Sequence, residues 1–349
     1  MPKISIIMPV YNASAFLEQS ILSLKRQTLS DIEIICVNDG SKDDSLQIIR
    51  KYASKDARIK IIDKPNGGYG HSMNCGLSIA RGKYIGILEP DDYIDINAFE
   101  KLYKIAEEND CQVVKANYNE RRDKLQQDSF IEVLSEVPYN KVTRASDYKK
   151  IVYMRPCIWS AIYNREFLLN NHISFNETPG ASYQDTSFAF KVWVCAERVY
   201  FIKDAFIHYR IDNENSSVNS KGKVFSICDE FWGIQSFLNQ KKQWRDCYSP
   251  ILQVLKFDAY MWNLDRISEE YKREFSDEIA LDFIKAEYDG FLDYSLFSES
   301  CLRKLKDIIS SYRDHSNQYK RMYDECRNSI SYKLGHAILQ PIRFVFKLK

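Results

Sequence analysis

The chain has 349 residues, of which 45% are hydrophobic, 13% aromatic and 28% charged, and this composition excludes an intrinsically disordered protein. The 49 basic and 48 acidic residues nearly cancel, which argues against a nucleic-acid or general polyanion binder. Only 12 glycines and 9 prolines are present, which excludes fibrous and low-complexity classes. The length predicts about two domains.

The N-terminal third alternates between strand and helix patterns. Strands separated by helices of about 10–15 residues predict βαβ units and a mainly parallel sheet. The nearly continuous apolar run at 32–39 predicts that this sheet is covered on both faces. The expected strands are 3–10, 32–39, 58–63, 83–92 and 111–118, and the expected helices are 14–27, 45–53, 71–82 and 96–110.

The rest of the chain changes character twice. Residues 116–150 are polar and less periodic, which predicts a loop with short strands near the mouth of a site. Beyond residue 220 the pattern is helical, and its aromatic residues are more typical of a core than of a binding surface. We therefore expect an α/β domain at 1–220, a helical region at 221–330 and a basic amphipathic tail at 331–349.

Cysteine usage and hydropathy bear on location. The nine cysteines include no CxxC or Cys/His pair, and several lie in apolar runs, which predicts reduced thiols and a cytoplasmic chain. The apolar run before Pro9 is too short for a signal peptide, and no run reaches the roughly 18 apolar residues of a transmembrane helix. The tail could lie on a membrane surface or pack as an ordinary or oligomer-forming helix, and a homo-oligomer stays open.

Polar residues follow each of the first strands, at the sheet edge where α/β proteins bind ligands. Any one of these segments could be a simple turn or helix cap, but their occurrence after four strands favours a site. The segments contain Pro9, Tyr11 and Asn12 after the first strand, Asp39 after the second, Asn66 and Gly67 after the third, and Glu89, Asp91 and Asp92 after the fourth.

These residue types suit a nucleotide-sugar. A carboxylate such as Asp39 can accept a hydrogen bond from a pyrimidine N–H, and Tyr11 can stack on the base. Glu89 and Asp91 offer oxygen ligands for Mn²⁺ or Mg²⁺ bridging a diphosphate. Neither a Walker A sequence nor a GxGxxG motif occurs, so P-loop and dinucleotide sites have no support.

The ordered set of motifs resembles that of family 2 glycosyltransferases with the GT-A fold. The similarity covers roughly the first 220 residues and is carried by ISIIMPVYNASAFLEQSILSLKRQT, IEIICVNDGSKDDS, NGGYGHSMNCGLSIARGKYIGILEPDDY and QDTSF. The resemblance implies a donor that is commonly a UDP-sugar, with Pro9, Tyr11, Asn12 and Asp39 lining the nucleotide pocket. It places the DxD metal motif on Glu89-Pro90-Asp91 and a diphosphate-side basic residue at Arg81.

Two positions depart from the pattern of that family. Its metal motif usually begins with Asp, whereas Glu89 is one methylene longer, and its Glu-Asp pair reads Gln184-Asp185 here. The resemblance makes Asp185 the general base of an inverting, single-displacement transfer, in which it takes the proton of the acceptor hydroxyl. The structural alternative for Asp185 is a helix N-cap or first-turn acid.

Further candidates surround that base. Trp159, Tyr183, Gln184 and Asp92 are expected on the acceptor side, although Trp159 could equally be a core residue. His208 and Arg210 are candidate diphosphate contacts, and a locally paired histidine is an equal interpretation of His208.

The resemblance implies an inverting, metal-dependent hexosyltransferase that acts on a lipid-linked saccharide acceptor in surface-polysaccharide or teichoic-acid synthesis. One alternative is a non-catalytic nucleotide-sugar-binding or scaffold protein of the same fold, suggested by Glu89 and Gln184. Another is a nucleotidyltransferase, which would need a basic, Gly-rich loop near the N-terminus that the chain lacks. The donor sugar, the acceptor and the linkage do not follow from the sequence.

Overall fold

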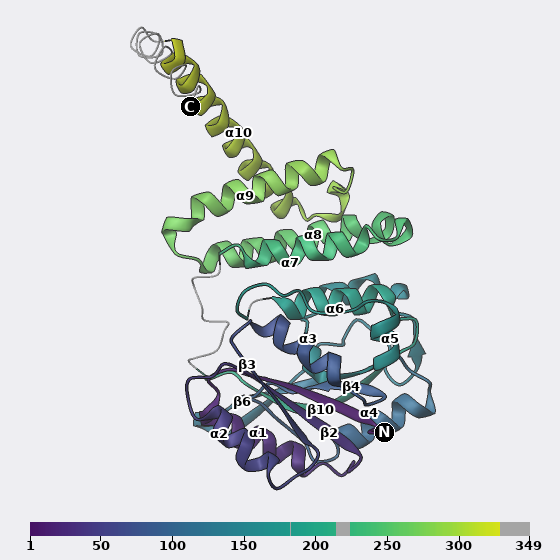
Figure 1. Ribbon diagram of the computed structural model, residues 1–349. Helices are drawn as coiled ribbons and strands as arrows, with labels where there is room; N and C mark the ends of the chain where they lie inside the picture. The colour runs from purple at the N-terminus through teal and green to yellow at the C-terminus, as the bar shows by residue number, and fades with distance from the viewer. Residues whose placement is uncertain (182, 214–223, 329–349) are drawn as a thin grey trace, which may run out of the picture. The chain divides into compact units, whose positions relative to one another are not determined.

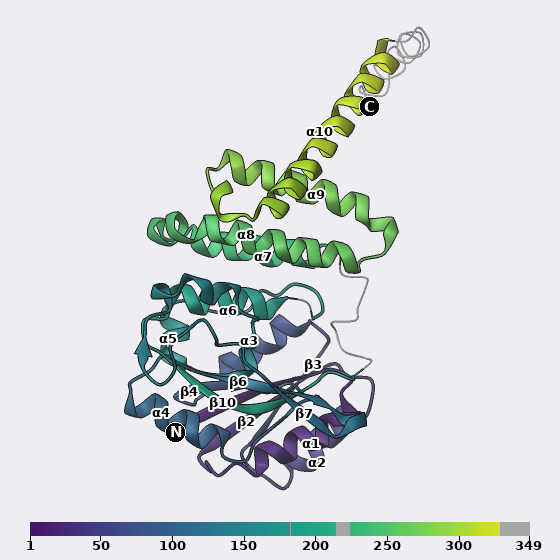
Figure 2. The same ribbon diagram turned by 180° about the vertical axis from the view of Figure 1, so that it is seen from behind.

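The computed structural model describes residues 1–181, 183–213 and 224–328, and it divides into two compact units, Met1–Leu255 and Lys256–Lys349. The first unit is a mixed sheet with helices on both faces (Figures 1 and 2). This confirms the predicted α/β class. The expected tail at 331–349 lies outside the described residues.

The strands of the first unit form one sheet with the order β3-β2-β1-β4-β9-β6-β10-β5, in which β7 pairs with β6 and β8 with β10. The first four strands pair in parallel, as βαβ connections require. The antiparallel β9 separates β4 from β6, so the predicted fifth strand does not extend the parallel series directly. The strands are β1 Ile4–Val10, β2 Ile32–Asp39, β3 Ile59–Lys64, β4 Tyr84–Ile87, β5 Tyr93–Ile94, β6 Val113–Arg122, β7 Gln127–Ile131, β8 Val142–Thr143, β9 Ala161–Asn164 and β10 Val199–Arg210.

Alternate side chains of β1 decide which helix covers which face. Ile4 and Ile6 share a buried cluster with residues of α1 and α4, whereas the Ile7 side chain lies directly against Gly76 of α3. Every residue of β1 and β2 is buried, as expected for strands covered on both faces. The helices of this unit are α1 Ser14–Lys25, α2 Ser45–Ala53, α3 Tyr69–Ile79, α4 Ala98–Glu108, α5 Arg165–Asn170, α6 Gln184–Cys195 and α7 Ser226–Leu238, followed by α8 Lys242–Arg266, which runs across the division.

The second unit has its own aromatic core. Phe257, Tyr260, Phe275 and Phe283 are almost fully buried, with edge-to-face rings 5.6–6.4 Å apart. The buried Lys256–Asp282 ion pair (3.0 Å) ties α8 to α9. The other helices here are α9 Glu269–Tyr288 and α10 Glu299–Asn328.

The expected strands and helices of the N-terminal third are all present, with ends shifted by a few residues. The structure groups residues 224–255 with the sheet, and the sequence division at residue 220 stays a prediction. The cysteines whose side chains are described are thiols and not disulfides. Among the described residues, no helix has both the length and the apolar character needed to cross a membrane.

Candidate functional site

The loops that follow β1, β2, β3 and β4 meet at one edge of the sheet. Val10 pairs with Asn38 and Asn38 with Asp63, so these strands end side by side. The Asn38 side-chain amide donates to Asp63 (2.8 Å), which joins two of the strand ends. The structure therefore brings together the polar segments that the sequence placed at a common edge.

The Asp39 carboxylate is the centre of one part of this edge. It accepts hydrogen bonds from the backbone amides of Gly67 (2.8 Å) and Gly68 (3.0 Å) and is paired with the Lys64 ammonium. Its own carbonyl accepts from the Asn66 side chain (3.0 Å). The expected nucleotide-side residues after β2 and β3 thus form one hydrogen-bonded unit, to which Lys64 is an addition that sequence reasoning missed.

The segment after β1 lies beside this unit. Asn12 adopts a left-handed backbone (φ 49°), and its side-chain oxygen accepts from the Lys42 amide (2.8 Å), which fixes the loop after β2. Tyr11 is 49% exposed, so its ring is available for stacking. Pro9 is buried within β1 opposite Val37.

The turn after β4 carries the acidic residues. The Tyr69 hydroxyl donates to Glu89 Oε1 (2.7 Å), and Asn213 donates to Asp91 Oδ2 (2.9 Å). Burial raises the pKa of Glu89 to about 8, although the Tyr69 bond opposes this, and the negative charges of Asp91 and Asp185 add to the rise. The Asp91 and Asp185 carboxylates therefore both lie near enough to Glu89 for their charges to act on it.

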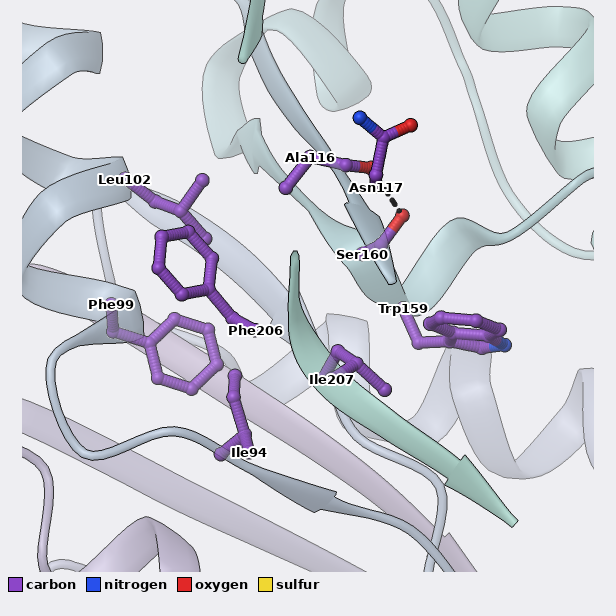
Figure 3. Close-up of a pocket in the computed structure, with 9 residues that line it drawn as sticks. All are labelled: Ile94, Phe99, Leu102, Ala116, Asn117, Trp159, Ser160, Phe206 and Ile207. Atoms are coloured by element: carbon purple, nitrogen blue, oxygen red, sulfur yellow. Dashed lines mark hydrogen bonds between the residues drawn. The ribbon is translucent and has the colours of Figure 1, made fainter. Parts of the chain in front are cut away.

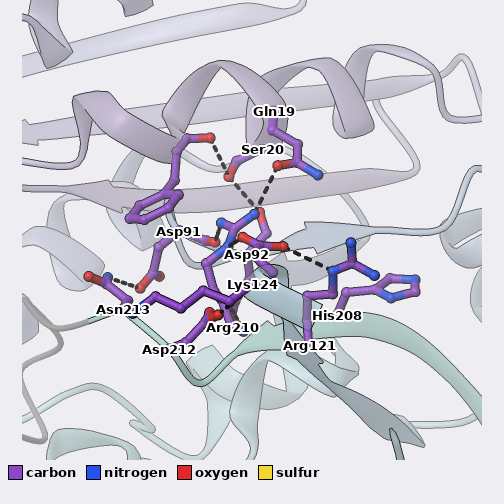
Figure 4. Close-up of polar contacts among 12 residues, drawn as sticks. Gln19, Ser20, Asp91, Asp92, Arg121, Lys124, His208, Arg210, Asp212 and Asn213 are labelled. Carbon is purple, nitrogen blue, oxygen red and sulfur yellow. Dashed lines mark hydrogen bonds and ion pairs between the residues drawn. The ribbon is translucent and has the colours of Figure 1, made fainter. Parts of the chain in front are cut away.

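Asp92 is 1% exposed, and Arg210 organises the turn around it (Figure 4). The backbone amide of Arg210 donates to Asp92 Oδ1 (2.8 Å), and its guanidinium bonds the Asp91 carbonyl, Asp123 and Gln19. Burial raises the pKa of Asp92 well above its usual range. Asp92 and Arg210 thus stabilise the turn through buried hydrogen bonds. Arg210 is 4% exposed, and its guanidinium already donates to protein groups.

Asp185 is the second residue of α6, and its carboxylate accepts from the Thr186 amide (2.8 Å). Burial raises its pKa to about 6, against the opposing effects of the Thr186 and Asp185 amides and the Arg155 cation. Its charge also raises the pKa of Glu89 and of Tyr69, so the carboxylate lies near both groups. The structure therefore brings Asp185 to the acidic turn from a helix about a hundred residues away in the chain.

Gln184 and Tyr183 begin that helix. Tyr183 has a left-handed backbone (φ 63°) at the N-cap position. Gln184 is 2% exposed and donates to the Thr178 hydroxyl (2.7 Å) and to the Thr178 and Gly180 carbonyls (3.3 Å each). An ionised acid at position 184 could make none of these bonds, which explains the departure at this position physically.

Trp159 belongs to an aromatic cluster. Its ring stacks on Tyr209 (5.3 Å between centroids, 7° between planes) and meets Tyr118 edge-on (4.8 Å). The Arg155 guanidinium lies over the Tyr118 and Tyr209 rings at 5.6 and 5.3 Å. Burial raises the pKa of Tyr209 to about 12, and the charges of the acidic turn add to the rise, so this cluster adjoins that turn.

Figure 3 shows a cavity lined by Trp159, by Ile94 of β5 and by side chains of α4, β6 and β10. Its volume is about 10 Å³, room for no more than a water molecule, and its lining is mostly apolar. It is a packing void in the core and not a substrate site.

Two expected site residues lie apart from the others or are already paired. Arg81 is exposed after α3, where its amide donates to Glu33 and the next amide donates to Ser5 (2.7 Å each); this is the amino edge of the parallel strands, opposite the acidic turn. His208 lies 3.1 Å from both Asp95 and Asp128 and stacks on Tyr93 at 4.3 Å. Burial alone would lower the pKa of His208, but the two carboxylates together outweigh it and raise that pKa.

The donor set fits a divalent cation held partly by substrate. Among the described residues, no group of three or more His, Cys, Asp or Glu side chains is arranged to hold a metal ion. Glu89 and Asp91 supply hard oxygen ligands whose mutual repulsion a cation would relieve. Two carboxylates completed by phosphate oxygens are typical of Mg²⁺ sites.

The model of glycosyl transferase family 2 matches residues 5–169. EpsJ of Bacillus subtilis (strain 168), described as an uncharacterized glycosyltransferase, is 35% identical over 221 residues, covering 62% of this chain and 63% of EpsJ. EpsH of the same organism, a putative glycosyltransferase by description, is 30% identical, covering 64% of this chain and 65% of EpsH. The chain therefore matches less than two thirds of the length of these relatives.

Solved structures of S. aureus TarS 1–349 share the fold. The complex with UDP-GlcNAc gives a TM-score of 0.70 at 19% identity, covering 90% of this chain and 92% of that one. The complex with UDP gives 0.67 at 20% identity, with 91% of each chain covered. The GT-A fold expected from the resemblance is confirmed.

Proposed function

We propose that the protein is an inverting, metal-dependent enzyme that transfers a sugar from a nucleotide-sugar to a saccharide acceptor. The match of residues 5–169 to the model of glycosyl transferase family 2 supports this proposal. The observation that carries this is the meeting of Glu89, Asp91 and Asp185 at the sheet edge that also holds Asp39. A donor-side pair of carboxylates and a separate basic carboxylate are the groups that this transfer needs.

The donor is proposed to be a UDP-sugar. Tyr11 offers an exposed ring for the base, and the Asp39 unit with Asn66 and Gly67 offers polar groups beside it. TarS, which shares the fold, has been crystallised with UDP and with UDP-GlcNAc. Mn²⁺ or Mg²⁺ held by Glu89 and Asp91 would offset the charge of the departing diphosphate.

Asp185 is proposed to be the base. Its carboxylate takes the proton of an acceptor hydroxyl while that oxygen bonds to the anomeric carbon, and the bond from that carbon to the diphosphate oxygen breaks. A pKa raised to about 6 leaves Asp185 ionised at neutral pH yet more basic than an ordinary aspartate. The partly exposed rings of Trp159 and Tyr209 beside Arg155 are the proposed acceptor side, because sugars pack on aromatic faces.

The acceptor is proposed to be a lipid-linked saccharide of surface-polysaccharide or teichoic-acid synthesis, handled in the cytoplasm with a peripheral membrane contact. This pathway is proposed from the family resemblance, and the similarity to the bacterial glycosyltransferases EpsJ and EpsH supports the class of enzyme. Membrane extracts supplied with labelled nucleotide-sugars would test it, because absence of any labelled product, alongside product from a working relative, would contradict the acceptor class.

The first test is calorimetric binding of UDP with and without Mn²⁺ to the wild type and to Asp91→Ala. We expect Mn²⁺-dependent binding that falls at least tenfold in the variant, because Asp91 would lose its carboxylate ligand. Lys42→Ala, an exposed change beside the same edge, serves as the control. A UDP affinity that depends neither on Mn²⁺ nor on Asp91 would contradict the proposed metal site. Absence of binding to any nucleotide would contradict the proposed function.

A further inference from the structure

Tyr69 makes a hydrogen bond to one of the donor-side carboxylates, and the metal motif alone does not account for this bond. Its hydroxyl donates to Glu89 Oε1 at 2.7 Å, in the metal-motif position where an aspartate is usual. An aspartate is shorter by one C–C bond, about 1.5 Å, so its carboxylate would not reach this hydroxyl without a backbone shift. The longer acid and the tyrosine are therefore matched to each other.

The position of Tyr69 is fixed by the segment 176–180 and by the preceding residue, Phe175. Its amide donates to the Gly180 carbonyl (2.8 Å), and its ring meets Phe175 edge-on at 5.9 Å. The flanking glycines allow this approach, since a Cβ on Gly68 would lie 2.9 Å from the Gly180 nitrogen and one on Gly70 would lie 1.9 Å from the Asn176 oxygen. Gly68 also has φ of 88°, which favours glycine.

The segment 176–180 is itself held from two helices. Gln184 of α6 donates to Thr178 and Gly180, and Glu230 of α7, fully buried, accepts from the Thr178 hydroxyl (2.7 Å) and the Asn176 amide (2.9 Å). Lys191 donates to Asn176 (2.8 Å) and compensates the Glu230 charge. A continuous set of hydrogen bonds thus runs from the helix that carries Asp185 to Glu89.

We propose that Tyr69 is a positioning residue that holds Glu89 through Oε1, so that Oε2 faces the divalent cation of the donor complex. This rests on the proposed function and adds a residue that the family pattern of the metal motif does not contain. Through the 176–180 segment, Tyr69 also fixes the place of Glu89 relative to Asp185.

A double-mutant cycle tests this pairing on the full-length chain, with wild type, Tyr69→Phe, Glu89→Asp and the double variant. Calorimetry would measure the Kd of UDP with saturating Mn²⁺ and again with EDTA. We expect each single variant to weaken Mn²⁺-dependent binding about tenfold, because each removes the Tyr69–Glu89 hydrogen bond, which in the Mn²⁺ complex is made to an ionised carboxylate. Once Tyr69→Phe is present, adding Glu89→Asp should cost less than about twofold, and binding in EDTA should not change.

The control for loss of a buried hydroxyl is Tyr84→Phe, whose hydroxyl donates to the Cys111 carbonyl (3.3 Å) at the opposite end of β4. It should leave the Mn²⁺ concentration for half-maximal turnover unchanged. Tyr69→Phe should raise that concentration about tenfold and recover most of its kcat at high Mn²⁺. A purely structural role would lower the Tm without this shift in Mn²⁺ dependence.

Equal cost of Glu89→Asp with and without Tyr69→Phe, or wild-type UDP·Mn²⁺ affinity in Tyr69→Phe, would overturn the proposal. Tight UDP binding that is indifferent to Mn²⁺ would overturn it as well while leaving a nucleotide-dependent enzyme. Absence of nucleotide binding by the wild type would instead refute the proposed function. The unfolding free energies of the same four proteins would then test the Tyr69–Glu89 pairing by itself. Additive effects of the two substitutions on these free energies would refute the pairing as well.

Discussion

Asp185 shows how one carboxylate is prepared for base chemistry. Its place in the first turn of α6 gives it the Thr186 amide as a donor, while burial acts more strongly in the opposite direction and raises its pKa to about 6. The raised pKa makes the folded protein less stable as pH rises from the ordinary range of aspartate through 6, because the charged form is buried. This cost in stability is typical of catalytic groups.

We predict that Asp185→Asn lowers turnover by at least about 100-fold and retains Mn²⁺-dependent UDP binding, since only the proton acceptor is lost. In the wild type, kcat/KM for the acceptor should fall as pH decreases through about 6. Steady-state kinetics with calorimetry on the same samples would check both. Turnover that survives the substitution would assign the base elsewhere, and nucleotide binding by a wild type that never turns over would favour the scaffold alternative.

Lys115 is a buried cation that belongs to the fold. Its ammonium donates to the Cys157 carbonyl (2.6 Å) and to the Ser160 hydroxyl (2.8 Å), beneath the segment that carries Trp159. Burial lowers its pKa to about 8, so the unfolded chain binds this proton more tightly than the folded chain does. The buried ammonium of Lys115 therefore lowers the stability of the folded protein at neutral pH. This loss disappears as the pH rises and the ammonium gives up its proton.

We predict that wild type gains stability relative to Lys115→Met between pH 8 and about 10.4, by up to roughly 1.4 kcal/mol per pH unit. Urea unfolding of both proteins across this range would measure the difference in stability. The titrations of tyrosines and cysteines that do not interact with Lys115 cancel from that difference. A difference that does not vary with pH would show that Lys115 titrates normally.

At the scale of elements, α6 depends on a neutral residue at its first position. Gln184 donates to carbonyl and hydroxyl oxygens of Thr178 and Gly180, and the same loop contacts Tyr69 of α3. The hydrogen-bonded segment 176–180 thus joins α3 to α6, and the acceptor-side base to the donor-side acids.

We predict that Gln184→Glu, which restores the acidic pair usual in the family, destabilises the protein by about 2 kcal/mol or more, because a buried carboxylate would face oxygen acceptors. Activity should fall with it. Thermal unfolding would check this against Gln240→Glu, an exposed change of the same chemistry after α7. A more active and equally stable Gln184→Glu would contradict the assigned role of the amide.

The sequence predicts the helices and strands themselves better than it predicts which of them lie side by side in the fold. Helices and strands up to residue 118 follow from periodicity and turn residues, which are local signals. The antiparallel β9 between β4 and β6 does not, because its four residues carry no periodicity. The Tyr69–Glu89 bond joins residues 20 apart and was likewise invisible, although the GGYG motif with its two close-packed glycines was a signal that could have been followed.

At the scale of the molecule, the compact unit that contains the site extends to Leu255. Glu230 of α7 bonds the 176–180 segment, and Tyr248 of α8 packs edge-on against Phe190 of α6 at 6.2 Å. The residues after 220 therefore complete the covering of α6 within this unit.

We predict that a fragment 1–255 is soluble, unfolds cooperatively and binds UDP, whereas 1–220 aggregates because it exposes the apolar side of α6 and removes Glu230. Size-exclusion chromatography and thermal unfolding of both fragments would check this. A well-folded 1–220 fragment that binds UDP would restore the domain boundary expected from the sequence.

Local patterns repeated along the chain were enough to predict the α/β class, the polar strand ends and the acidic turn. Which of those residues meet depended on the packing of the whole unit. That packing brought Asp185 to Glu89 and Asp91, and it placed Arg81 at the opposite edge because α3 runs back along the sheet. It also bonded Arg210 to the acidic turn. Side-chain partners follow from strand order and helix packing, and no local pattern encodes these.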